Sequence, residues 1–250
     1  MSSGPRDPNT CECSKVDLAD LASVHRFCDE LRGAVPAVDI AVLNAGLMPR
    51  RPSRSTQGHE LMFAVHFLAN RVLVDRLLAD GVIRPSDTPG HAPRVVVVSS
   101  EAHRAADAID FNQLGAFTPY RFSDGLKFYG LSKLVQCTFV HELSRRLNPR
   151  GPVRVAVHAL CPGPINSAIA REAPLSLKPL LGGVMKAFFA TPERAAAPVI
   201  YLCCSAAAGQ RTGIYLHMMR EKELSAEARD PDNGARLWAK SGGMASRDAR

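Results

Sequence analysis

The sequence predicts an α/β fold, a doubly wound parallel sheet covered by helices. Continuous apolar runs at residues 38–43, 94–98 and 153–160 are typical of strands buried on both faces of a sheet. Longer segments with apolar residues at helical spacing alternate with these runs, and this alternation favours a parallel sheet. Each run also passes directly into a turn of small or polar residues, as strands do where they end.

Length and composition are those of a single domain. A chain of 250 residues with 46% hydrophobic content can bury one large core, which we expect over residues 11–219. Residues 1–10 are polar and contain proline and glycine, so a disordered leader is expected there. Residues 220–250 are expected to form a polar, peripheral tail, apart from Leu237 and Trp238.

The sequence argues against secretion, metal binding and nucleic-acid binding. It has no signal-peptide core at its start and no run of roughly 18 apolar residues, which favours a cytoplasmic protein. Seven cysteines, an odd number spread along the chain, indicate reduced thiols. Neither Cys11 with Cys13 nor Cys203 with Cys204 has a second ligand pair, so no metal site is predicted. The net charge of +7 comes without an aromatic-and-basic recognition motif, so no nucleic-acid partner is expected.

The first helix is predicted over residues 17–31. Asp17 at its start is a residue type that commonly caps helices. Its apolar residues share one face: Leu18, Leu21, Val24, Phe27, Cys28 and Leu31. The strand that follows closes in Asn44, Ala45 and Gly46, where small residues permit a tight turn and let backbone approach a ligand.

A long helix is predicted next, over residues 57–78, with His66 in its middle. The strand at residues 94–98 follows it and ends in Ser99 and Ser100. Because strand side chains alternate between faces, only one of these two hydroxyls should face a cleft at the strand end.

The helix predicted over residues 126–147 carries Tyr129 and Lys133 one turn apart, so both side chains can face one ligand. The pair suits proton transfer. A tyrosine with an ordinary pKa near 10 needs a shift of roughly three units, about 4 kcal/mol, to exchange protons near pH 7. A lysine charge about 4 Å away contributes on the order of 4 kcal/mol at an effective dielectric of roughly 20. The spacing alone more often marks a surface pair, so its meaning depends on the neighbouring motifs.

The third strand leads into a turn that contains Pro162 and Gly163. The apolar stretch at residues 175–189 beyond it suits a cover over a hydrophobic substrate, a dimer interface or a membrane-surface helix, with buried packing as the default. A capped helix is predicted over residues 191–204, and residues 213–218 are predicted to form the last strand.

In their order and spacing, these segments resemble the short-chain dehydrogenase/reductase family, most closely its retinol-dehydrogenase-like, carbonyl-reducing members. The resemblance covers the chain from about Lys15 to Met219. It implies a Rossmann-like fold and an NAD(P)-dependent oxidoreductase that interconverts a hydrophobic alcohol and its aldehyde or ketone. In the family pattern Ser100 holds the substrate oxygen and Tyr129 is the general acid/base. Lys133 lowers the pKa of Tyr129 and grips the ribose.

The resemblance also implies a dinucleotide site, with NADP as the expected cofactor and NAD as the alternative. The residues implied are Asp17 at the adenine, Asn44, Ala45 and Gly46, Tyr129 and Lys133, Pro162 and Gly163, Ile165 through its backbone, and Ser167 through its hydroxyl. Asp17 therefore has two interpretations, helix cap and adenine contact. His66 stands where the family has an asparagine whose backbone holds a water of the proton relay, and it is either a relay member or a hydrogen-bonded core residue.

One family feature has no counterpart in the sequence before Asp17: the Gly-rich turn, between two strands, that binds the pyrophosphate. The expected fold is therefore an N-terminally truncated Rossmann-like sheet whose strand at residues 38–43 has an unpaired, apolar edge. Two functions remain open. One is the oxidoreductase, with a small hydrophobic carbonyl or alcohol as substrate and a homodimer left open. The other is a non-catalytic remnant, an interaction protein or a shortened gene product that binds no dinucleotide.

Overall fold

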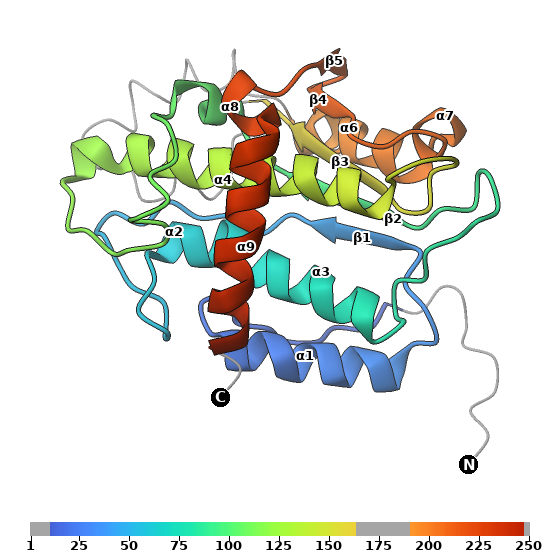
Figure 1. The fold of residues 1–250 in the computed structure, drawn as a ribbon, viewed down its shortest axis with the longest axis horizontal. Helices are drawn as coiled ribbons and strands as arrows, with labels where there is room; N and C mark the ends of the chain where they lie inside the picture. The colour runs from blue at the N-terminus through green and yellow to red at the C-terminus, as the bar shows by residue number, and fades with distance from the viewer. Residues whose placement is uncertain (1–10, 164–190, 248–250) are drawn as a thin grey trace.

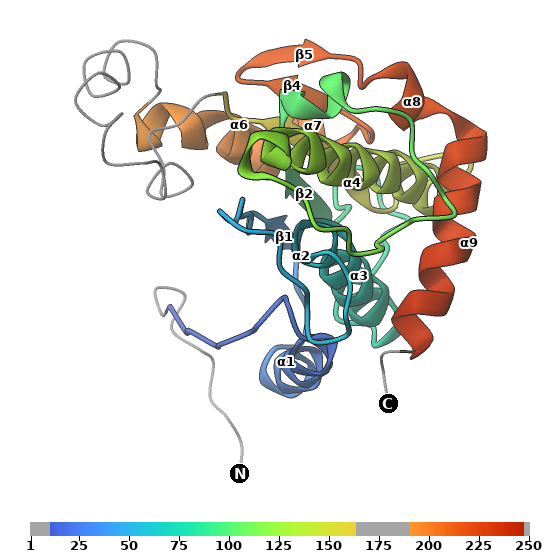
Figure 2. The same ribbon diagram turned by 90° about the vertical axis from the view of Figure 1, so that its left-hand side faces the viewer.

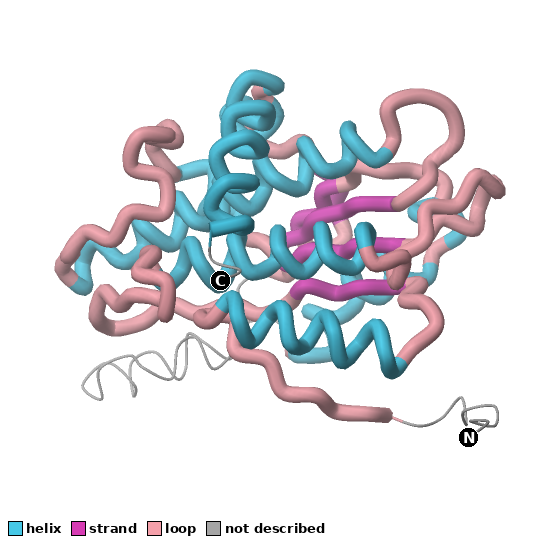
Figure 3. Tube along the Cα trace, turned by 60° about the horizontal axis from the view of Figure 1, so that its bottom comes forward, coloured by secondary structure: helices cyan, strands magenta, loops and turns pink. Residues whose placement is uncertain are grey.

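The computed structural model describes residues 11–163 and 191–247, which form a five-stranded sheet with helices on both faces (Figure 1). The strand order is β1-β2-β3-β4-β5, in which the first four strands are parallel and β5 is antiparallel to β4. The strands are β1 (Ile40–Leu43), β2 (Arg94–Val98), β3 (Ala156–Cys161), β4 (Tyr215–His217) and β5 (Arg220–Lys222). Figure 3 shows the strands side by side, and the predicted α/β architecture is confirmed.

Alternation of side chains along the strands divides the core into two layers. Val95 and Val97 of β2 pack in the larger layer with helices α3 (Ala69–Ala79) and α4 (Gly125–Leu147). Val96 faces the opposite way and packs with Leu202 of α6 (Pro192–Cys204). Figure 2 shows α3 and α4 on one side of the sheet and α6 on the other. A sheet covered on both faces explains why its strands are continuous apolar runs.

The helix predicted over residues 57–78 begins later than expected and contains a π turn. It consists of α2 (Leu61–Phe63), the π turn η1 (Ala64–Leu68) and α3, and Glu60 is its N-cap. At the π turn, the His66 carbonyl accepts a hydrogen bond from the Asn70 side chain (2.8 Å). Single π turns inside helices occur frequently at functional sites.

The first helix, α1 (Leu21–Ala34), is capped by Asp20, so the prediction of Asp17 as its cap was wrong. The Asp20 carboxylate accepts from the Ala22 N–H (3.0 Å), whereas Asp17 accepts from Ala19 (2.9 Å) in the preceding turn. Both aspartates fit the cap pattern, and the contact of Asp20 with the Gln57 side chain (3.1 Å) favours a helix start there. Helix α1 packs against α3 (Figure 1).

The C-terminal residues are part of the core, so the expectation of a peripheral tail was wrong. The strand predicted as the last, β4, is followed by β5, α8 (Ala226–Arg229) and α9 (Pro231–Arg247), and α9 crosses α4 (Figure 1). Leu237 is buried, and the Arg71 guanidinium lies 3.7 Å from the centre of the Trp238 ring. Arg71 also donates to the Ser241 hydroxyl (2.9 Å). The apolar residues of α9, Leu237, Trp238, Met244 and Ala245, pack on the core beside these polar contacts.

The predicted open edge of the sheet is confirmed at β1. Among the described residues its strand neighbour is β2 alone, and Ile40 and Val42 are 43% and 41% exposed. Unpaired backbone groups beside exposed apolar side chains form a surface on which another chain can pair. Within the two described ranges, no helix is long and apolar enough to cross a membrane, and no group of acidic, histidine or cysteine side chains is arranged as a metal site.

Candidate active site

Ser100, Tyr129 and Lys133 meet at the carboxyl end of β2. Ser100 follows that strand directly, and α4, which carries the tyrosine and the lysine one turn apart, packs on the short helix η2 (Glu101–Ala105) that comes next. The Ser100 hydroxyl lies close enough to the Tyr129 phenol to act on its pKa. The Lys133 ammonium donates to the Val98 carbonyl (3.2 Å). The first turns of α4 therefore bring both side chains to the strand end.

The two serines at the end of β2 have different surroundings. Ser99 is buried, and its hydroxyl lies 3.1 Å from the Cys137 thiol of α4. Ser100 is half-buried, caps η2 by accepting from the Ala102 N–H (3.2 Å), and reaches Tyr129. Alternation of side chains along a strand accounts for this difference. Of these two hydroxyls, the one beside the phenol is therefore that of Ser100.

Burial raises the pKa of Tyr129, and the Ser100 hydroxyl beside it opposes this shift only in part. The Lys133 ammonium lies 5.8 Å from the centre of the Tyr129 ring and is hydrogen-bonded to Val98 and Gln136. The pKa of Tyr129 is therefore raised and not lowered as expected, because burial of the phenol is the largest effect on it. Tyr129 is a protonated acid at neutral pH.

Gln136 connects Lys133 to the π turn. Lys133 is 3% exposed, and burial lowers its pKa to about 8. Its ammonium donates to the Gln136 side-chain oxygen (3.0 Å), and the Gln136 amide donates to the His66 backbone carbonyl (2.9 Å). Sequence reasoning missed Gln136, although a polar residue one turn after Lys133 in an apolar helix was a usable signal.

Of the two roles considered for His66, the structure matches the hydrogen-bonded core residue. Its Nε2 accepts from the Leu47 N–H (3.0 Å), so the proton of the neutral ring lies on Nδ1, which donates to the Ser132 hydroxyl (2.9 Å). Ser132 donates in turn to the Tyr129 carbonyl (2.7 Å). Burial and the nearby Lys133 charge hold the pKa of His66 well below its usual value. The neutral ring thus ties the turn after β1 to α4.

The turn after β1 passes beside this lysine. Asn44, Ala45 and Gly46 are exposed, and a Cβ atom at Gly46 would lie 3.6 Å from His66 Nε2 and 3.9 Å from Lys133 Nζ. An added Cβ atom would make only ordinary contacts there, so the turn lies beside the ammonium and stays accessible from outside.

Of the other cofactor residues implied by the resemblance, three lie within the described part of the chain. Pro162 and Gly163 directly follow β3, and Gly163 has a φ of 84°, a backbone conformation that favours glycine. Asp17 lies in the turn before α1, and its side-chain hydrogen bond stays within that turn. Ile165 and Ser167 lie outside the described residues, as does the apolar stretch expected to cover the substrate.

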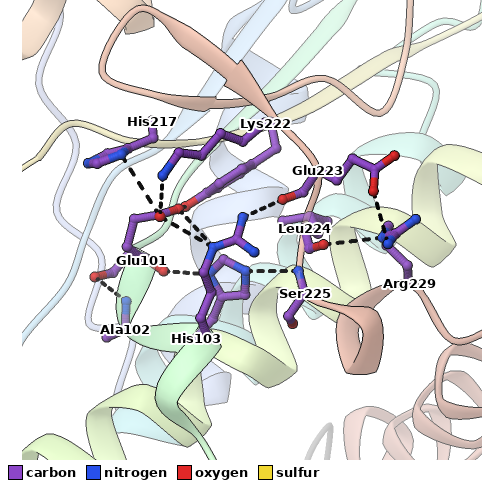
Figure 4. Close-up of polar contacts among 12 residues, drawn as sticks. Glu101, Ala102, His103, His217, Lys222, Glu223, Leu224, Ser225 and Arg229 are labelled. Atoms are coloured by element: carbon purple, nitrogen blue, oxygen red, sulfur yellow. Dashed lines mark hydrogen bonds and ion pairs between the residues drawn. The ribbon is translucent and has the colours of Figure 1, made fainter.

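An ionic cluster at Glu101 holds the segment that follows β2 (Figure 4). The Glu101 carboxylate accepts from the Tyr215 hydroxyl of β4 (2.8 Å) and the Lys222 ammonium of β5 (2.7 Å). Burial opposes ionisation, but these two hydrogen bonds and the charge of Arg104 lower the pKa of Glu101 to about 2. The hairpin of β4 and β5 is thereby fastened to the strand end that carries the candidate site.

His103, for which sequence reasoning assigned no role, fixes the backbone of Ser100 (Figure 4). Its Nε2 accepts from the Ser225 N–H (3.2 Å), so Nδ1 carries the proton and donates to the Ser100 carbonyl (2.7 Å). Burial lowers the pKa of His103, which keeps the ring in this neutral form. The end of β2 is thus linked to the segment that precedes α8.

The chain has relatives among known proteins in sequence and in structure. No family model matches the chain. It is 35% identical to retinol dehydrogenase 14 of Mus musculus over 227 residues, which are 90% of this chain and 64% of that protein. It is 33% identical to retinol dehydrogenase 13 of Homo sapiens over 243 residues, 94% of this chain and 68% of that protein. The chain therefore spans slightly less than two thirds of the length of retinol dehydrogenase 14.

Solved structures share the fold. An uncharacterised protein of Mycobacterium paratuberculosis matches with a TM-score of 0.64 and 25% identity, over 92% of this chain and 74% of that one. The complex of Pseudomonas aeruginosa RhlG with NADP matches with a TM-score of 0.58 and 22% identity, over 81% of this chain and 73% of that one. Because 33% of its aligned residues are identical to those of retinol dehydrogenase 13, across 68% of that protein, the chain belongs to the short-chain dehydrogenase/reductase family, among its retinol-dehydrogenase-like members.

Proposed function

We propose that the protein is an NAD(P)-dependent oxidoreductase that interconverts a small hydrophobic alcohol and its aldehyde or ketone. The observation that carries the proposal is the placement of the Ser100 hydroxyl beside the Tyr129 phenol at the carboxyl end of β2, with the buried ammonium of Lys133 one turn away. The carboxyl ends of strands are where open α/β sheets bind their ligands. The relatives named above as retinol dehydrogenases support the same class of reaction.

Each residue of the site has a chemical task in this proposal. The substrate oxygen lies between the Ser100 hydroxyl and the Tyr129 phenol, both of which can donate to it. In the direction of reduction, Tyr129 gives its proton to the carbonyl oxygen while Ser100 stabilises the charge that develops there. The Lys133 ammonium then stabilises the phenolate that remains. When bound, the nicotinamide dinucleotide supplies or accepts the hydride.

The residues around Lys133 fit the nicotinamide ribose of such a cofactor. The turn of Asn44, Ala45 and Gly46 is exposed beside the ammonium, which would hold the ribose hydroxyls. Pro162 and Gly163, with Ile165 and Ser167, would enclose the nicotinamide, and Asp17 would contact the adenine. We propose NADP, since the solved complexes of RhlG and of a Burkholderia cenocepacia short-chain dehydrogenase contain it. NAD is the alternative.

A second candidate function rests on one observation. Among the described residues, β1 presents an open, apolar edge. This edge favours a non-catalytic protein that associates with another chain through β1. This candidate predicts no dinucleotide binding by the folded protein.

The two candidates are separated by titrating the purified 250-residue chain with NADPH and NADH. Binding is followed by energy transfer from Trp238 and the tyrosines to the nicotinamide, with calorimetry as the check. If the protein is the oxidoreductase, we expect it to bind both dinucleotides with micromolar affinity, NADPH more tightly than NADH. We also expect it to turn over hydrophobic aldehydes or ketones. A folded chain that binds neither dinucleotide supports the non-catalytic candidate.

A further inference from the structure

A cavity lies on a different face of α4 from Tyr129 and Lys133. It has a volume of about 320 Å³ and is enclosed by the loop at residues 107–118, the start of α2 and the α4 residues Phe128, Leu131 and Val135. These α4 positions repeat at helical spacing and lie roughly 120° around the helix from Tyr129 and Lys133. A ligand in this cavity would therefore approach α4 from a different side than the substrate of the proposed reaction.

The wall formed by the loop is held in place by tight local contacts. Gly115 has a φ of 71°, and a Cβ atom there would lie 2.5 Å from the Phe63 ring, so only glycine lets the loop pass this close. The Gly115 carbonyl accepts from the Glu60 N–H (3.0 Å). The loop, the N-cap and the first turn of the helix thus form one continuous wall.

Glu60 has an unusual environment for a carboxyl group. It is 5% exposed, and its Oε2 accepts from the Phe63 N–H (2.8 Å) as the helix cap. Its Oε1 is buried without a hydrogen-bond partner among the described residues, and the same holds for the hydroxyl of Tyr120. Tyr120 stacks on Phe128 of the cavity wall, with ring centres 4.1 Å apart, and the charge of Glu60 acts on its phenol. Burying such groups without partners costs free energy, so both are suited to a ligand that donates hydrogen bonds.

The charge of the cavity selects the kind of ligand. Three carboxyl groups line it, those of Glu60, Asp107 and Asp110, and its described lining contains no lysine or arginine. Asp107 pairs with Lys127 (2.7 Å) at the surface, whereas Glu60 is buried and has no cation partner in the described part of the chain. The rest of the lining is mainly apolar and aromatic. An anion would be repelled, while an organic cation would gain a counter-ion and aromatic faces.

We propose that this cavity binds a hydrophobic amine as its ammonium ion. The Glu60 carboxylate is the counter-ion, and Phe63 and Phe128 of the cavity wall enclose the apolar part. Burial raises the pKa of Glu60, and a bound ammonium reverses this shift because it favours the ionised carboxylate. The affinity of the cavity for the ammonium ion should therefore fall as the pH falls and Glu60 becomes protonated. This site is independent of the oxidoreductase reaction proposed above.

The test compares 2-phenylethylamine with 2-phenylethanol, a neutral molecule of the same shape, by calorimetric titration of the full chain at pH 7.5. The amine is expected to bind at least about tenfold more tightly than the alcohol. Glu60→Gln, which keeps an acceptor for the helix cap, should weaken amine binding by about tenfold or more. Asp87→Asn removes an exposed carboxylate elsewhere and should leave it unchanged. Equal binding of the two probes, equal binding by Glu60→Gln, or no binding of the amine would overturn the proposal.

A second measurement locates the bound probe in the wild-type protein, so that the helix cap at Glu60 stays unchanged. Intermolecular NOEs are expected between the phenyl ring of 2-phenylethylamine and the methyl groups of Leu131 and Val135. NOEs to other methyl groups only would overturn the proposed site. Circular dichroism of Glu60→Gln shows whether that variant is folded, and the NOE result decides the matter if it is not.

Discussion

Lys133 has a charge that the proposed reaction requires and an environment that opposes it. Its stem is buried in α4, and its ammonium has two described acceptors, the Val98 carbonyl and the Gln136 side chain. Burial lowers its pKa from 10.5 to about 8. Between these two values the unfolded chain holds a proton that the native protein has released. Stability linked to Lys133 is therefore fully present above pH 10.5 and is lost as pH falls through about 8.

Lys133→Met should remove this pH dependence. Wild-type protein is expected to gain about 2 to 3 kcal/mol from Lys133 between pH 7 and pH 10, and the variant is not. Urea unfolding at both pH values measures the difference, and contributions from the buried thiols cancel because both proteins share them. The same change in stability in both proteins would contradict the burial of a charged Lys133.

Tyr129→Phe tests the proposed acid. Loss of the hydroxyl should lower turnover by roughly 10²- to 10⁴-fold, the usual contribution of general acid–base catalysis. NADPH affinity should stay within a few-fold, because the ribose contact is assigned to Lys133. Tyr201→Phe, at a half-exposed position on α6, serves as the control and should retain full activity. Unchanged turnover in Tyr129→Phe would remove Tyr129 from the mechanism.

At the scale of elements, we expect the open edge of β1 to be the site of self-association. Ile40 and Val42 are exposed there beside unpaired backbone groups. Val42→Lys should weaken concentration-dependent self-association, because a charge on an edge strand disfavours pairing with another chain. Ile200→Lys alters an apolar residue of α6 that is 59% exposed and should have little effect. Sedimentation velocity at several concentrations measures both, and equal association of Val42→Lys and wild type would show that β1 is not the contact.

Elements fixed by local chemistry could be predicted from the sequence, and elements fixed by distant contacts could not. β2 begins and ends where its apolar run does, and α6 begins after the Thr191 cap. The start of α1 instead depends on Gln57, and α9 is held by the contacts of Arg71 with Trp238, which join segments far apart in the chain. In the same way, spacing identified the residues proposed for catalysis, whereas the partner of the Gln136 amide, the His66 carbonyl, lies in a segment 70 residues away and could not be predicted.

At the scale of the whole molecule, three buried histidines each join segments that are far apart in the chain, and all three use the same pattern of hydrogen bonds. Each ring accepts a backbone N–H on one nitrogen and donates from the other, so each must be neutral. The pairs are His66 with Leu47 (3.0 Å), His103 with Ser225 (3.2 Å) and His158 with Ile214 (3.3 Å). Burial lowers the pKa of all three rings. Protonation would break the accepted bond in each case, so the native protein keeps the rings neutral while the histidines of the unfolded chain take up protons. Mild acid should therefore lower the stability of the whole fold.

His158→Gln tests this acid sensitivity at a site remote from the proposed chemistry. The pKa of His158 is lowered from 6.5 to about 4, so below pH 6.5 the unfolded chain takes up a proton before the native protein does. Stability from His158 is therefore fully present above pH 6.5, and about 3 kcal/mol is lost as pH falls to 4. Glutamine keeps a donor for the Ala208 carbonyl and an acceptor for Ile214, but it does not titrate.

Between pH 7 and pH 4, the His158→Gln variant should therefore lose about 3 kcal/mol less unfolding free energy than wild type. His91→Gln, at an exposed position, should lose as much as wild type. Urea unfolding across this range measures all three proteins. If His158→Gln lost as much stability as wild type, the ring of His158 would have to be charged in the native protein, and the N–H of Ile214 would then need a different acceptor.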